Sequence, residues 1–533
     1  MRLVIPHTGE LQAEDARLVR LAEFLGIDCE RVFFAKHDHG SAEYLPKTLS
    51  EPGSCLLVNP RVFKQWTGGE VSADLVAGLT SRFPNILVHA LGAQDSFDER
   101  LIRALSGNRL HSVRPVDDAK LYEIPANSRD VCGAFSGLSF GPVNRANDLV
   151  LAVDAKADVR TLVSVGGSPF VALIKHDGAQ LVFLASADVL DVDEEISDRP
   201  LNEYFSRLVP QAMALRYIFG EHCWRPSASC ASFIIDDPLL RPRYGYLDYA
   251  SLLNLMEEHN FSTTIAFIPH NYRRNSTSTI EMFRQRSGRL GICFHGNDHT
   301  AGEFASADSS QLNTMLQTAE RRMDSHSSAT GLYCPRIMVF PQDDFSVEAM
   351  KVLKSRNFCA AVCGTPHPAG HRVKLTIREQ AQPAILRHAN FPLFFRRSIG
   401  RIKAEDIALN VLFGQPVLVS EHHGLFQHVK RLLEDVQMIN SIAPDIQWCD
   451  LETALLKSTL SRRTPDLVNH VRAYSRVVPI ANNSDSPGRF LVEWSHSTEC
   501  PPIERVLQGG MPIDSFTVDE GTIRVSVELP HRT

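Results

Sequence analysis

The chain has 533 residues, of which 44% are hydrophobic and 22% are charged, a composition typical of a folded protein with two or three domains. Its formal charge of −7 provides no basic surface that would attract a nucleic acid or an anionic membrane, so neither partner is expected. The first apolar run is broken early by Pro6, which argues against a signal peptide, and no apolar segment approaches the ~20 residues of a membrane span. We therefore expect a cytoplasmic protein.

Residues 1–225 alternate apolar runs with helical patterns, which predicts an α/β domain. Buried strands are expected at residues 3–5, 55–58 and 86–88, with an amphipathic helix at 13–25. Short, closely spaced strands are expected from residue 149 onwards. This layout resembles the class I glutamine-amidotransferase-like, flavodoxin-like fold. Active members carry a cysteine on the turn after a strand, but here that turn reads Gly92-Ala-Gln-Asp. We therefore interpret this domain as a non-catalytic scaffold or binding module.

Residues 226–460 repeat strand and helix in turn. Strands are expected at 232–235, 263–268, 290–294, 337–340, 359–362 and 416–420, and helices at 247–259, 311–323, 346–354 and 426–439. This alternation predicts parallel strands, in either an open sheet or a β/α barrel. Residues 461–533 are poor in helical pattern, and strand-like runs at 476–480, 490–494 and 522–529 predict a small β-sandwich-like domain.

Polar side chains that could bind a metal follow two of the central strands. Asp236 and Asp237 end the first strand, and His295 and His299 stand four positions apart at the end of the third. The carboxyl ends of strands in a parallel β/α domain are where active sites collect. Imidazole nitrogen and carboxylate oxygen together suit a catalytic divalent ion. Asp343 and Asp344, by contrast, are interpreted as the loop that starts a helix.

These motifs are followed by Arg336, by the aromatic-proline pair at 340–341 and by a late strand that ends in histidine. In that order they resemble the NodB-type polysaccharide deacetylases of carbohydrate esterase family 4. The resemblance implies a distorted β/α barrel that hydrolyses acetyl groups on saccharides with one divalent metal. It also implies a role for each residue: Asp236 as general base, Asp237, His295 and His299 as metal ligands, Arg336 as partner of the base, and His422 as general acid, with His423 as the alternative.

Three ligands that leave open positions make zinc the first choice of metal, with cobalt, nickel or manganese as alternatives. The chemistry of acyl hydrolysis makes a backbone N–H near Phe340 or Gln342 the candidate donor to the oxyanion. The sequence departs from the family pattern at Gly296, where Ser or Thr is usual. It has one or two extra residues before the aromatic-proline pair, and it lacks an Asp-x-x-Asp-Trp segment between Arg336 and His422. The expected substrate is an acetylated saccharide. A small amide, cleaved by an amidase, and a non-catalytic role in polysaccharide assembly are the alternatives.

Overall fold

A computed structural model describes residues 1–35, 53–118, 120–144, 146–154, 157–186, 188–196, 200–495, 503, 505–513, 516–519 and 521–532. The chain divides into two compact units, one of residues 1–224 with 376–378 and one of the remaining residues 225–375 and 379–533. The predicted boundary at residue 460 lies within strand β26 (Leu460–Arg463), so the proposed three-domain division stays a prediction. None of the described helices combines the length and the apolar character that a membrane crossing requires.

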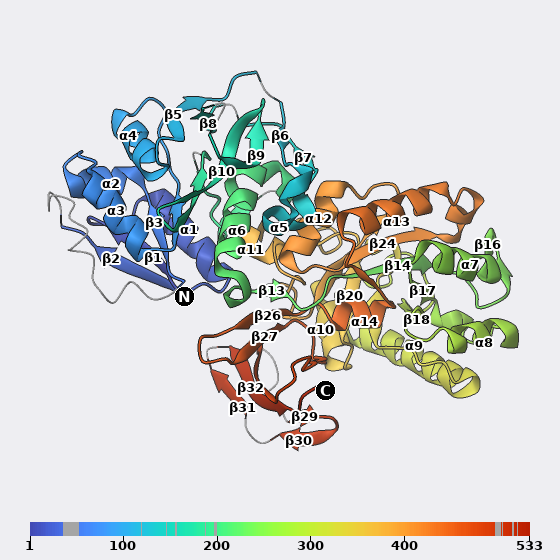
Figure 1. Cartoon of the computed structure of the whole chain (residues 1–533). Coiled ribbons are helices and arrows are strands. Elements are labelled where there is room, and N and C mark those ends of the chain that lie inside the picture. The colour runs from blue at the N-terminus through green and yellow to red at the C-terminus, as the bar shows by residue number, and fades with distance from the viewer. Residues whose placement is uncertain are drawn as a thin grey trace. The chain divides into compact units, whose positions relative to one another are not determined.

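The N-terminal unit is built on a mixed sheet in which strands β2-β1-β3-β4 are parallel (Figure 1). These strands are Cys29–Phe33, Leu3–His7, Cys55–Val58 and Asn85–Val88. Helices α1 (Ala13–Phe24), α2 (Pro60–Thr67) and α3 (Ala73–Arg82) lie between them in the chain, and α4 (Ser96–Leu105) follows β4. The sheet continues through the mostly antiparallel strands β11-β10-β9-β6-β7, of which β9 to β11 lie within 160–184. The expected change to closely spaced strands after residue 149 is therefore seen.

The turn after β4 begins with an unusual backbone conformation. Ala90 has φ 54°, in the left-handed region that non-glycine residues seldom adopt. The residue is an alanine and carries no nucleophile. His89, next to it, is buried, and its Nε2 lies 2.7 Å from Oδ1 of Asp15. The amidotransferase-like interpretation of this unit stays a prediction.

The second unit contains a nearly closed barrel of parallel strands, and the sequence prediction of an α/β chain with a central β/α barrel is confirmed. The strand order is β22-β20-β19-β18-β17-β14-β24-β23, and every neighbouring pair is parallel. The bounds are Leu393–Phe395, Ala360–Cys363, Ile337–Val339, Leu290–His295, Thr263–Phe267, Cys230–Asp236, Val417–His422 and Arg397–Ser398. Strand β14 is buried at every position, as expected for a parallel strand covered on both faces.

A single residue links the two edges of this sheet. Strands β22 and β23 stand at opposite ends of the strand order, yet only Arg396 separates them in the chain. The chain therefore passes from one edge of the sheet to the other at Arg396, and this step draws the sheet into a barrel.

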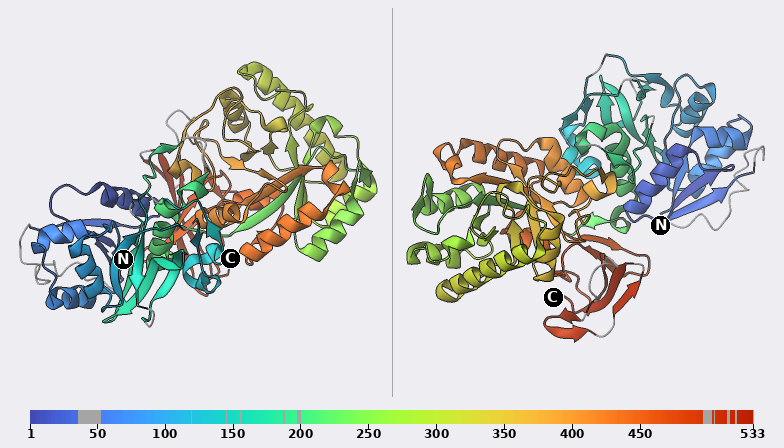
Figure 2. Two further views of the ribbon diagram at one scale, coloured as in Figure 1. Left: turned by 90° about the horizontal axis from the view of Figure 1, so that it is seen from above. Right: turned by 180° about the vertical axis from the view of Figure 1, so that it is seen from behind.

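Helices lie around the outside of the barrel strands (Figure 2). They are α7 (Tyr249–His259), α8 (Thr277–Gln285), α9 (Ser309–Thr330), α10 (Val347–Ser355), α12 (Ala404–Phe413), α13 (Lys430–Ile442) and α14 (Leu451–Leu456). Side chains of Asp248, Ser276, Asp308, Ser346 and Asp450 cap five of their N-termini by accepting backbone N–H groups. The predicted helix at 426–439 begins four residues late, because residues 423–427 form a 3₁₀ turn.

The C-terminal residues add a six-stranded sheet in the order β13-β26-β27-β28-β32-β31. The strands are Arg225–Pro226, Leu460–Arg463, Asn469–Ala473, Gly488–Ser495, Thr522–Leu529 and Phe516–Asp519. The strands predicted at 490–494 and 522–529 are present as β28 and β32. The strand predicted at 476–480 is wrong, since those residues run irregularly and Pro479 has no N–H to donate to a sheet.

A buried histidine that is not one of the predicted metal ligands is expected to make the stability of the barrel depend on pH. His326 in α9 is 1% exposed, its ring lies 5.4 Å from that of Phe267, and burial lowers its pKa to about 4. Below about pH 6.5 the unfolded chain binds a proton that the folded protein excludes. The free energy of unfolding should therefore fall as the pH falls toward 4, by about 2 kcal/mol between about pH 6.5 and about pH 5.

Urea unfolding of the wild type and of His326→Phe at about pH 7 and about pH 5 measures this contribution. Phenylalanine cannot titrate, so the variant should lose less stability on acidification than the wild type. The exposed His371, changed to Gln, is the control and should behave as the wild type. An equal acid loss in wild type and His326→Phe would refute the role of His326.

Candidate metal-dependent active site

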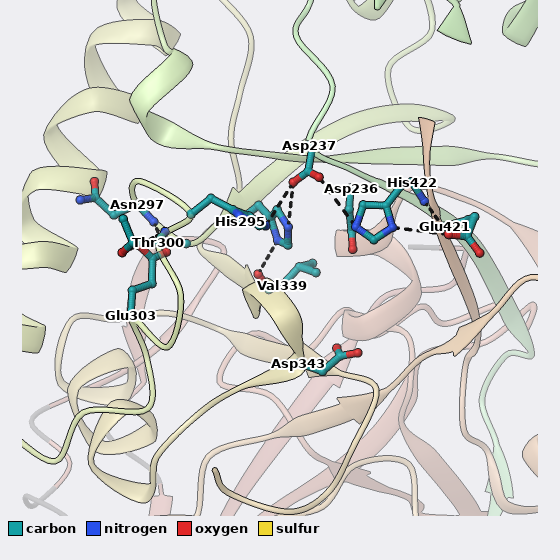
Figure 3. A network of polar contacts seen from close by, with 12 residues as sticks. Asp236, Asp237, His295, Asn297, Thr300, Glu303, Val339, Asp343, Glu421 and His422 are labelled. Carbon is teal, nitrogen blue, oxygen red and sulfur yellow. Dashed lines mark hydrogen bonds and ion pairs between the residues drawn. The ribbon is translucent and has the colours of Figure 1, made fainter. Parts of the chain in front are cut away.

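Three predicted ligands meet at the carboxyl edge of the barrel. Asp237 directly follows β14, His295 ends β18, and His299 lies in the loop after it. Nε2 of His295 and Nε2 of His299 each lie 3.3 Å from Oδ1 of Asp237. One ligand atom from each residue falls within 4.8 Å of the others. Figure 3 shows Asp237 pointing toward His295 on one side and His422 on the other.

The polar atoms of this cluster fit a bound cation. Nδ1 of His295 pairs with the carbonyl oxygen of Val339 at 2.9 Å, which aims Nε2 at Asp237. Among the described residues, neither the buried Nε2 of His295 nor the buried Oδ1 of Asp237 has a hydrogen-bond partner. Buried polar atoms are nearly always paired, and two imidazole nitrogens with one carboxylate are a donor set for zinc and similar divalent ions.

The backbone at the site is strained in two of the three predicted ligands. Asp237 has φ 80° and His299 has φ 57°. Such conformations cost on the order of 1–3 kcal/mol each, and they persist where the surrounding structure forces them, often at functional sites. The strain therefore supports a site that is organised before any ligand arrives.

Glu303 holds the loop between the two histidines, a role that the sequence did not reveal. Its carboxylate accepts the backbone N–H of Asn297 at 2.8 Å and that of Asp298 at 3.2 Å (Figure 3). Gly296 has φ 67°, and a Cβ there would lie 1.8 Å from Oε1 of Glu303. The departure at Gly296 thus has a physical reason, because the Glu303 carboxylate occupies the space that a Ser or Thr side chain would need.

Asp236 is paired with Arg396. One guanidinium nitrogen, NH1, donates to both carboxylate oxygens of Asp236, each at 2.8 Å. NH2 of the same Arg396 donates to Oδ1 of Asp343 at 3.0 Å, and Asp343 also accepts the Gly364 N–H. The Arg396 and Asp236 side chains are only 6% and 5% exposed. Burial lowers the pKa of Arg396, but Asp236 and Asp343 outweigh it and raise that pKa, so the guanidinium stays charged.

The prediction that Arg336 pairs with the base is wrong. Arg336 donates instead to Glu320 at 2.8 Å and to the carbonyl oxygen of Arg356 at 2.8 Å. It precedes β19, so it lies at the amino edge of the barrel, whereas the site lies at the carboxyl edge. Arg396 follows β22 and therefore emerges at the correct edge. The interpretation of Asp343 as part of a helix-start loop is incomplete, since its carboxylate holds Arg396.

The two candidate acid histidines have different surroundings. Nε2 of His422 lies 3.7 Å from Oδ2 of Asp237, and its Nδ1 lies 3.4 Å from Oε1 of Glu421. The hydrogen bond to Glu421 is the main cause that raises the pKa of His422. The ring of His423 packs against Tyr244 instead, with ring centroids 4.8 Å apart. The geometry therefore favours His422 as the residue that faces the metal ligands.

Of the two backbone donors suggested for the oxyanion, one is already used. The Phe340 N–H donates to the carbonyl oxygen of Val362 at 3.1 Å within the sheet. Gln342 lies in the following turn with φ 58°. The Gln342 N–H is therefore the remaining candidate.

Three solved structures show what the chain is similar to. The carbohydrate deacetylase Agd3 aligns over 99% of this chain and 99% of its own, with 8% identity and a TM-score of 0.49. A family 4 carbohydrate esterase from Streptomyces lividans, in complex with acetate, aligns over 42% and 91%, with 11% identity and a TM-score of 0.25. A pseudoenzyme of family CE4 from Bacillus anthracis aligns over 42% and 68%, with 11% identity and a TM-score of 0.24. No family model and no curated protein matches the sequence.

We expect the purified protein to bind about one divalent ion per chain, because one carboxylate and two imidazoles form a single cluster. His295→Ala combined with His299→Ala should abolish this binding, as measured by elemental analysis after dialysis against zinc. His367→Ala with His371→Ala is the matched control, since these histidines have the same spacing but lie in another loop. Full occupancy in the first double variant would exclude this cluster as the metal site.

Proposed function

We propose that the protein is a metal-dependent hydrolase that removes acetyl groups from a saccharide or a saccharide precursor, with zinc as the first choice of metal. One observation carries the proposal: the Asp237, His295 and His299 cluster lies beside the buried ion pair of Asp236 and Arg396 at the carboxyl edge of the barrel. Metal ligands, a paired carboxylate and a histidine are the parts that metal-assisted acyl hydrolysis needs.

Asp237, His295 and His299 would hold the divalent ion. When bound, such an ion lowers the pKa of water and polarises an acyl carbonyl. Asp236 accepts the proton that the attacking water loses as its oxygen bonds to the acyl carbon. Arg396 donates to both oxygens of Asp236 and holds this carboxylate in place for the step.

The second half of the reaction breaks the bond between the acyl carbon and the sugar nitrogen or oxygen. His422 donates a proton to that leaving atom, and the raised pKa of His422 favours the protonated form that can do so. The Gln342 N–H donates to the oxygen that becomes negative during the attack. The products are acetate and an amino or hydroxyl sugar, so all atoms are accounted for.

Acetate release tests the proposal directly. The metal-loaded protein should release acetate from N-acetylated chito-oligosaccharides or O-acetylated sugars, and chelation should abolish release until zinc is added back. Simple linear and cyclic amides complete the panel, because hydrolysis restricted to them would indicate an amidase. No hydrolysis of any compound by fully metal-loaded protein would exclude the proposed activity and favour the non-catalytic alternative.

A further inference from the structure

A polar cavity lies beside the proposed acid. Its volume is about 670 Å³, within the range of ligand sites. Its lining comes from the segment after β23, from the end of β24 and from α13, and it includes Ser398, Gly400, Arg401, Glu421, Arg431 and Asp435. None of these residues is among the predicted metal ligands or catalytic residues.

Glu421 connects this cavity with the site. Its Oε1 accepts the backbone N–H of His422 at 3.0 Å and lies 3.4 Å from Nδ1 of the same residue (Figure 3). His422 in turn reaches Asp237 on its other side. When the leaving atom of a substrate contacts His422, the substrate groups next to that atom can therefore reach the cavity.

The acidic groups around the cavity already have partners. Glu421 pairs with His422, and Glu434 lies 3.5 Å from Nζ of Lys430. Asp435 is 6% exposed and accepts the Gly400 N–H through Oδ2 at 2.6 Å. Of these carboxylates only Asp435 is buried, while the pair of Glu434 with Lys430 is an exposed surface contact.

The arginines of the cavity make no such direct contacts, although the pKa of Glu421 is lowered by its hydrogen bond to His422 and also by the charge of Arg401. Over the part of the chain that the structure describes, the side chains of Arg401 and Arg431 make no hydrogen bond and no ion pair. The Arg431 side chain packs over Gly400. Its Cδ lies 3.7 Å from the position that a Cβ atom at residue 400 would occupy. Two guanidinium groups at one cavity offer a set of N–H donors that suits a carboxylate or a phosphate.

We propose that this cavity is a binding subsite for an anionic group of the substrate, with Arg401 and Arg431 as its specificity-determining residues. The proposal rests on the proposed function in taking the ligand to be a saccharide. The substrate would then be an acetylated saccharide that carries a carboxylate or a phosphate on the sugar next to the scissile bond.

Direct binding tests the subsite without any turnover, so a failure of hydrolysis leaves this measurement intact. The zinc-loaded protein is titrated by calorimetry with tetragalacturonate, with glucose 6-phosphate and with neutral cellotetraose, none of which carries an acetyl group. An anionic probe should bind more tightly than the neutral one, and its affinity should fall with added salt. Preference for the first or the second probe identifies carboxylate or phosphate as the group recognised.

Arg401→Met combined with Arg431→Met should lower the affinity for the anionic probe by roughly 10-fold or more and leave the affinity for the neutral probe unchanged. Arg286→Met is the matched control, since Arg286 lies at the opposite, amino edge of the barrel before β18. Replacing both arginines with lysine should retain part of the affinity, which separates lost charge from a damaged fold. The proposal is overturned if no anionic probe binds better than cellotetraose, or if the methionine pair binds the anion as the wild type does.

Discussion

Asp236→Asn is expected to lower turnover by roughly 10²- to 10⁴-fold while the protein keeps its metal, because the variant lacks only the proton acceptor. Asparagine has nearly the same size, and Arg396 retains Asp343 as an ionic partner, so the barrel should still fold. Asp237→Asn should behave differently, since it removes an anionic oxygen from the ligand cluster. Its activity should fall together with its metal content.

Metal content and acetate release, measured on both variants, separate the two carboxylates. The structure gives them different neighbours, since Asp236 faces Arg396 and Asp237 faces the histidines. Turnover of the Asp237 variant should recover in part when zinc is added in excess, whereas excess zinc should not help the Asp236 variant. Equal loss of metal in both variants would contradict the division between base and ligand.

The parts of the site that the sequence predicted share a local signal. Asp236, Asp237 and His295 each end or follow a long apolar strand, so their place at the carboxyl edge follows from the strand pattern alone. The barrel class also follows from local alternation of strands and helices. In both cases the information lies within a few residues of the feature predicted.

Arg396 carried no such signal. It lies between a three-residue strand and a two-residue strand, and both are too short to show a period. Its position depends on how the sheet closes, which is decided by pairings between residues far apart in the chain. Glu303 was missed for a similar reason, since a single glutamate in a loop does not indicate which backbone N–H groups it will meet.

Arg336 was chosen for its motif, but one local observation argues against it. It precedes its strand, and residues before a parallel strand lie at the edge away from the active site. The position of Arg336 before its strand would therefore have excluded it. Whether a residue comes before or after a predicted strand can be read from the sequence, so this criterion applies without knowledge of the final fold.

Arg396→Met is expected to destabilise the protein by about 3–5 kcal/mol, because it leaves the buried Asp236 without its cation. Turnover of the folded fraction should also fall, since the base loses the two hydrogen bonds that hold its carboxylate in place. Metal binding should persist, because the Arg396 side chain donates its hydrogen bonds to Asp236 and Asp343, which are not predicted metal ligands. Arg396→Lys keeps the charge and should retain part of both the stability and the turnover.

Arg336→Met is the matched control and also tests the prediction made from the motif. Arg336 is 40% exposed, and Glu320 keeps Arg356 as a partner in this variant, so the loss should be about 1 kcal/mol or less. Turnover and metal content should stay at the wild-type level, since Arg336 lies at the amino edge. Urea unfolding, zinc content and acetate release on the Arg396 and Arg336 variants decide between the two arginines. A large loss of turnover in Arg336→Met, with wild-type turnover in Arg396→Met, would mean that the pair seen at Asp236 does not support the base.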